Sequence, residues 1–158
     1  MQKAVTTHPV PCRTLVRWPV PGRFATIPRH PPMSNKPIPV YVVDDEPSVC
    51  TAYARLLRSA RMQPRTFSSV EEFMRTDLSD ECACVISDVR MPGCGGIELT
   101  QMLRQAGRKW PVILVTAYDT AETRNLAREA GVAAYFRKPV DDQALLDSIA
   151  WALFREPR

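Results

Sequence analysis

The sequence lacks any hydrophobic run approaching the ~20 residues that a membrane-spanning helix needs, which excludes an integral membrane protein. It is also poor in zinc-binding patterns, because His8 and His30 both lie near the N-terminus and no Cys-x-x-Cys pair occurs. Five cysteines, an odd number, argue against a disulfide framework and fit a reducing compartment. Cys82 and Cys84 have the alternation expected of small buried side chains on one strand. We therefore expect a cytoplasmic protein with no membrane partner.

Acidic residues are absent from residues 1–38, which contain six basic side chains and so account for the formal net charge of +4. Nine of the fifteen prolines fall within residues 1–39, and no helical or strand periodicity persists there. Such a stretch cannot bury enough apolar surface to offset the entropy lost on ordering. We predict that residues 1–36 form a disordered Pro/Arg-rich extension.

Three interpretations of this extension remain open. Its arginine-rich, acid-free composition is typical of organelle transit peptides and of nucleic-acid-binding arms, although it lacks the apolar core of a secretory signal. The third interpretation, which we favour, is that translation starts at Met33 and that the preceding residues lie upstream of the true start.

Short apolar runs alternate with helical patterns from residue 39 onward. Runs rich in β-branched residues predict buried strands at 40–43, 84–86 and 112–115, with weaker strand candidates at 62–67 and 133–136. Apolar stripes at helical spacing predict helices at 48–60, 68–74, 97–106, 120–130 and 141–154. Gly131 stands where the fourth helix should end. This alternation predicts an α/β fold, a doubly wound five-stranded parallel sheet with the flavodoxin-like order 2-1-3-4-5.

Chemically reactive side chains follow four of the five predicted strands. In an open parallel sheet the ligand site lies at the carboxyl ends of the strands. The residues found at these ends are Asp44 and Asp45, then Asp88, Thr116 and Lys138. Each type is common at such positions as a helix cap or turn residue, but their joint occurrence predicts one rim with three carboxylates, a hydroxyl and an ammonium.

This rim has the groups that phosphoryl transfer needs. Clustered carboxylates repel one another unless a cation lies among them, and Mg²⁺ is the cation that accepts a few carboxylates together with phosphate oxygens. A carboxylate can itself be a phosphoryl nucleophile. Mg²⁺ and Lys138 would neutralise the transferring group, and Thr116 would donate a hydrogen bond to one of its oxygens.

Four segments resemble the motif blocks of the CheY-like receiver family: PVYVVDDEPSV, VISDVRMPGCGGIEL, VILVTAYD and AAYFRKPV. The phrase VVDDE and the Asp-x-x-Met-Pro turn are similar to the FixJ-type subgroup. The resemblance covers about residues 38–156. It implies a CheY-like receiver domain at 37–158, a phosphorylation-dependent signalling switch of a two-component phosphorelay rather than a turnover enzyme. The donor would be a sensor histidine kinase or a phosphotransfer protein.

The resemblance also implies a role for each site residue. By this resemblance Asp88 is the phosphoacceptor, and Mg²⁺ is bound by Asp88, by Asp45 directly, by Asp44 indirectly and by the backbone carbonyl of Arg90. Thr116 is the switch hydroxyl and Tyr135 is the rotating aromatic residue. Lys138 is the phosphoryl-binding ammonium, and its peptide bond to Pro139 is cis. On phosphorylation, Thr116 would move and Tyr135 would turn inward. The face of the fourth helix, fifth strand and fifth helix would then change for a homodimer or protein output partner.

Arg90 and Tyr118 lie two residues after the acceptor and the switch threonine, where family members flank the path of the hydrolytic water. Both are large and neither is suited to orienting a water. We therefore predict slow autodephosphorylation.

FixJ-type regulators usually continue into a DNA-binding domain, whereas four residues follow Phe154 here. We expect a stand-alone receiver that acts through a protein partner, without direct nucleic-acid binding. The alternative is the receiver part of a truncated DNA-binding transcriptional regulator. A phosphatase of the haloacid dehalogenase type would need an aspartate where Arg90 stands, and a flavin site would need a phosphate cradle where residues 44–47 are acidic.

Overall fold

The computed structural model describes residues 37–78 and 82–154, so the predicted extension at 1–36 lies outside the described residues. Five strands alternate with five helices: β1 (Pro39–Val43), α1 (Pro47–Ser59), β2 (Gln63–Phe67), α2 (Val70–Arg75), β3 (Cys84–Asp88), α3 (Gly96–Gln105), β4 (Val112–Thr116), α4 (Ala121–Ala130), β5 (Ala134–Arg137) and α5 (Asp142–Phe154). Every predicted element is present, and its bounds shift by at most two residues.

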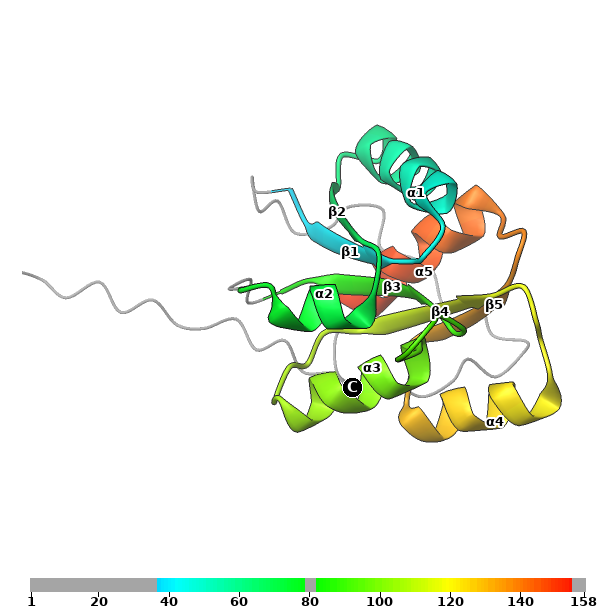
Figure 1. Cartoon of the computed structure of the whole chain (residues 1–158). Coiled ribbons are helices and arrows are strands. Elements are labelled where there is room, and N and C mark those ends of the chain that lie inside the picture. Colours follow the sequence, from blue (N-terminus) through cyan, green and yellow to red (C-terminus); the bar gives the residue numbers. More distant parts are fainter. Residues whose placement is uncertain (1–36, 79–81, 155–158) are drawn as a thin grey trace, which may run out of the picture.

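The five strands form one parallel sheet in the order β2-β1-β3-β4-β5, which confirms the predicted topology. Helices α1 and α5 cover one face, and α2, α3 and α4 cover the other (Figure 1). All strands run the same way, so their carboxyl ends share one edge of the sheet. In the ranges that the structure describes, no helix is both long and apolar enough to cross a membrane.

The strands are apolar throughout because successive side chains enter different cores. In β1, Val40 and Val42 join the cluster that includes α1 and α5 residues, such as Leu57 and Ile149. Their neighbour Tyr41 joins the opposite cluster with residues of α2, α3 and α4, where its ring packs against other aromatic rings. The two cores hold the central strands on both sides and thereby fix the positions of their ends.

Strand β2 forms an edge of the sheet and tolerates a proline there. The Gln63 amide donates to the Ile38 carbonyl at 2.8 Å, so the backbone of Gln63 faces β1. The next residue, Pro64, therefore faces away from the sheet, where its missing N–H breaks no ladder bond.

The prediction for Cys82 is wrong. Strand β3 begins at Cys84, which is fully buried, whereas Cys82 precedes the strand and is exposed. Burial raises the pKa of the Cys84 thiol to about 12, so this group stays protonated and unreactive near neutral pH.

Helix α2 begins two residues later than predicted, at Val70, whereas α4 ends at Gly131 as predicted. The Ser69 side chain caps α2 by accepting a hydrogen bond from the Glu72 amide at 3.1 Å. Helix α4 ends at Gly131, whose φ of 76° is left-handed and favours glycine. These boundaries place the loops that follow β2 and precede β5.

Candidate functional site

The carboxyl edge of the sheet brings the predicted carboxylates together. Asp44 follows β1 and Asp88 ends β3, and both are buried, whereas Asp45 is exposed. One ligand oxygen from each of the three carboxylates lies within 4.8 Å of the others. The neighbouring strand β4 ends at Thr116, and Lys138 follows β5. The topology thus assembles the predicted rim.

The Lys138 ammonium lies between the two buried carboxylates. Its Nζ is 2.9 Å from Asp44 Oδ2 and 3.1 Å from Asp88 Oδ2. Burial disfavours the charged ammonium, but hydrogen bonds and charges from the two aspartates outweigh burial and raise the pKa of Lys138 to about 12. The Lys138–Pro139 peptide bond is cis, as the resemblance implied.

Backbone amides orient the other carboxylate oxygens. The Glu46 amide donates to Asp44 Oδ1 at 2.9 Å, and the Arg90 amide donates to Asp88 Oδ1 at 3.2 Å. Helix α3 approaches the end of β3 closely at Gly96, since a Cβ there would lie 2.5 Å from the Asp88 carbonyl oxygen. A side chain at position 96 would therefore displace the end of β3.

The donor set fits a hard divalent cation. Three carboxylates face one ammonium, so the cluster retains two excess negative charges. Carboxylate oxygens are the ligands that Mg²⁺ prefers, and the exposed Asp45 leaves room for the waters that Mg²⁺ keeps. The residues present could hold such an ion, while ligation by the Arg90 carbonyl stays a prediction.

Thr116 is fully buried and its hydroxyl is engaged by the following loop. Its Oγ1 donates to the Tyr118 carbonyl at 3.2 Å and accepts from the Tyr118 amide at 3.0 Å. If Thr116 moved toward Asp88, both of these hydrogen bonds would have to break.

Tyr135 is bound to a pair of residues that the sequence analysis missed. Its hydroxyl donates to Asp119 Oδ1 at 3.2 Å, and Asp119 accepts two further hydrogen bonds from the Arg124 guanidinium, at 2.7 and 2.6 Å. The Arg124 hydrogen bonds lower the pKa of Asp119. Burial, together with the Asp119 charge, raises the pKa of Tyr135 to about 12.

Arg90 and Tyr118, predicted separately to flank the water path, contact each other. The Arg90 Cζ lies 5.3 Å from the centroid of the Tyr118 ring, a cation–π distance. Tyr118 remains 65% exposed. The pair therefore links the loop after β3 to the loop after β4, on the same edge as Asp88.

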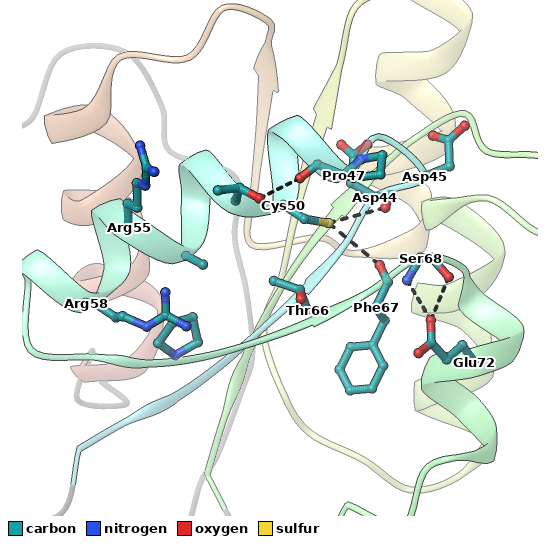
Figure 2. A pocket seen from close by; sticks show the side chains of 13 residues that line it. Asp44, Asp45, Pro47, Cys50, Arg55, Arg58, Thr66, Phe67, Ser68 and Glu72 are labelled. Atoms are coloured by element: carbon teal, nitrogen blue, oxygen red, sulfur yellow. Dashed lines mark hydrogen bonds between the residues drawn. The ribbon is translucent and has the colours of Figure 1, made fainter.

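An open groove of about 500 Å³ borders the acidic cluster between α1 and β2 (Figure 2). Asp44 and Asp45 lie at one end, and Arg55 and Arg58 lie along α1. The Cys50 thiol donates to the carbonyls of Asp44 and Phe67, at 3.3 and 3.9 Å, and so ties α1 to the ends of β1 and β2. Burial raises the pKa of Cys50, which favours this structural role over reactivity.

Residues 40–150 match the family model of the response regulator receiver domain. The chain belongs to this family. It is therefore a receiver of the CheY-like type, a domain of phosphorylation-dependent two-component signalling. This membership decides against the flavin-binding and haloacid dehalogenase interpretations.

The receiver is similar to regulators of the FixJ type. It is 40% identical over 119 residues to the transcriptional regulatory protein TdiR of Thauera aromatica, covering 74% of this chain and 52% of TdiR. It is 31% identical over 118 residues to the transcriptional regulatory protein FixJ of Azorhizobium caulinodans, covering 75% of this chain and 56% of FixJ. The receiver thus spans just over half the length of these two relatives.

Among solved structures, the receiver resembles the crystal structure of FixJ-N. The TM-score is 0.69 at 25% sequence identity, and the match covers 78% of this chain and 98% of FixJ-N. The likeness supports both the fold and the FixJ-type assignment.

Proposed function

We propose that the receiver accepts a phosphoryl group on Asp88 from the phospho-histidine of a sensor kinase or phosphotransfer protein. The observation that carries this proposal is the convergence on Asp88 of the Arg90 amide, the Lys138 ammonium and two further carboxylates. Asp88 ends a central strand that is held by both cores, so its carboxylate has a defined position. Such preorganisation favours transfer to one residue.

In the transfer, a carboxylate oxygen of Asp88 forms a bond to phosphorus while the phosphorus–nitrogen bond of phospho-histidine breaks. The electron pair of that bond stays on the imidazole nitrogen, which carried no proton while it was bonded to phosphorus and can then take one from solvent. Lys138 would turn from Asp88 toward a phosphoryl oxygen, and Thr116 would donate its hydroxyl to another. Later hydrolysis of the aspartyl phosphate restores Asp88, so the receiver is a self-dephosphorylating switch and not a turnover enzyme.

Asp44, Asp45 and Asp88, together with the Arg90 carbonyl, would hold Mg²⁺. The bound ion would neutralise charge on the transferring phosphoryl group. We expect chelation by EDTA to abolish labelling of the receiver by a phosphorylated histidine donor and added Mg²⁺ to restore it. Gel separation of the labelled proteins measures this, with dephosphorylation of the donor alone as the control. Labelling that persists in excess EDTA would contradict the metal proposal.

The phosphorylated state would signal through α4, β5 and α5. Thr116 ends the strand beside β5, and Tyr135 lies on β5, so a change at both residues reaches this face directly. Trp151 and Phe154 are half-buried near the end of α5 and would belong to a surface for a homodimer or a protein output partner.

Regulation of transcription is a second candidate function for the protein. TdiR and FixJ are both transcriptional regulatory proteins, and the receiver spans 52% and 56% of their lengths. The receiver would then control the output of a DNA-binding partner or region rather than bind DNA itself. A cytoplasmic location fits both candidates, because the kinase reaction uses cytoplasmic ATP.

Residues 37–158 would form the complete switch, with residues 1–36 dispensable. In the part of the chain that the structure describes, the two cores are built from residues between 40 and 153. We therefore expect both cores to form without the N-terminal stretch. We expect deletion of residues 1–36 to leave both the melting temperature and the labelling rate unchanged. Thermal unfolding followed by circular dichroism measures the first. A loss of several degrees would show that the deleted stretch packs on the receiver.

A further inference from the structure

The loop between β4 and α4 contacts both residues of the expected switch. Thr116 exchanges hydrogen bonds with the backbone of Tyr118, and Tyr135 donates its hydroxyl to the next residue, Asp119. Two adjacent loop residues thus bind the two groups that would rearrange on phosphorylation. A movement of this loop would therefore alter both contacts.

Asp119 is held firmly enough to position Tyr135. Its side chain is 13% exposed, and its two oxygens accept from Nε and Nη2 of Arg124 in a bidentate pair. The planar guanidinium fixes the plane of the carboxylate as well as its position. The oxygen that binds Tyr135 is therefore preorganised by α4.

We propose that Asp119, oriented by Arg124, is a positioning residue that holds Tyr135 in its resting orientation and so sets how readily the receiver switches. The inference rests on the proposed phosphorylation of Asp88. Inward rotation of Tyr135 would break this hydrogen bond to a charged acceptor, so the bond would stabilise the orientation of Tyr135 in this structure over the rotated one. Loss of the bond shifts the population toward the active state before any phosphoryl group arrives.

The first experiment measures binding of beryllofluoride, a phosphoryl mimic, to the full chain with Mg²⁺ by calorimetry. We expect Tyr135→Phe and Asp119→Ala each to tighten binding about threefold. A change of this size is typical of an interaction between groups that solvent partly screens. The double variant should bind no tighter than either single variant, because both changes remove the same bond. Asp77→Ala, which removes an exposed carboxylate elsewhere, is the control and should bind like the wild type.

Arg124→Ala separates positioning from simple electrostatics. Loss of a positive charge alone would weaken binding of an anionic mimic. Release of Asp119, and with it Tyr135, would tighten binding instead. We expect tighter binding, and weaker or unchanged binding by Arg124→Ala would overturn the proposal, as would independent effects in the double variant.

A second readout needs neither metal nor mimic. Asp119 contributes to the raised pKa of the Tyr135 phenol, so Asp119→Ala should lower that pKa toward its ordinary value of 10, with burial keeping it higher. Nuclear magnetic resonance of ¹³C-labelled tyrosine measures the titration. An unchanged pKa would show that Asp119 does not hold Tyr135. If the wild type bound no beryllofluoride, the proposed function would fail, while this titration would still decide whether Asp119 holds Tyr135.

Discussion

Asp88→Asn should receive no phosphoryl group from a phospho-histidine donor under conditions that label the wild type fully. The amide has nearly the same shape, and its one carbonyl oxygen can still accept from either the Arg90 amide or Lys138, so the fold is expected to survive. A neutral amide is not a nucleophile toward phosphorus, however, and it is a poorer metal ligand than a carboxylate. Intact-protein mass spectrometry after incubation with the donor measures the transfer.

Two further variants make this result specific. Asp77→Asn changes an exposed carboxylate to the same amide and should be labelled like the wild type. Asp45→Asn should reduce labelling at low Mg²⁺ and recover at high Mg²⁺, because it affects metal affinity rather than the acceptor. Undiminished labelling of Asp88→Asn would show that another residue is the acceptor.

Phosphorylated Arg90→Ala and Tyr118→Ala should each lose phosphate about fivefold faster than the wild type, which corresponds to the roughly 1 kcal/mol of an exposed cation–π contact. Hydrolysis needs a water in line with the bond to be broken, opposite the leaving carboxylate. The stacked pair connects the two loops that border Asp88, so we expect it to obstruct that approach. The decay of phosphorylated protein after donor removal measures the rate.

Conservative variants show whether the stacking of the two side chains, the charge of Arg90 or the hydroxyl of Tyr118 slows the loss of phosphate. Tyr118→Phe keeps the aromatic face and should decay at the wild-type rate. Arg90→Lys keeps the charge but loses the planar guanidinium, so its decay should be faster than that of the wild type. Arg58→Ala, on the exposed face of α1, should have no effect. Decay of Arg90→Ala and Tyr118→Ala at the wild-type rate would show that the pair does not shield the phosphate.

The central strands could be predicted with more certainty than the edge strands for a physical reason. Strands β1, β3 and β4 are covered on both faces, so their sequences are continuously apolar. Strand β2 has the sequence QPRTF and is largely exposed, which leaves little pattern to detect. The apolar pattern locates β3 correctly at Cys84, but it also includes Cys82, because apolar alternation does not mark where a strand begins.

The rim residues were predictable because parallel topology alone brings Asp44, Asp88, Thr116 and Lys138 to one edge. The contact between Asp119 and Tyr135 was not, since it joins residues 16 apart and depends on the loop conformation and on side-chain rotamers. The pairing of Asp119 with Arg124 spans five residues, which is not a spacing that places side chains together on a helix. Arg90 and Tyr118 were predicted as neighbours of the water path, but their mutual contact emerged only in three dimensions.

Pro64 has a consequence for how copies of the receiver can associate. An open strand edge is a template on which another chain can add a strand, and such growth leads to aggregation. At the β2 edge, the ring of Pro64 removes a donor that an added strand would need, and the exposed Arg65 places a charge beside it. Addition of a strand at β2 is therefore disfavoured. Partners and further copies of the receiver would instead meet the helix-bearing faces or the other edge strand, β5. The surface of α4, β5 and α5 is the one that a movement of Thr116 and Tyr135 would reshape.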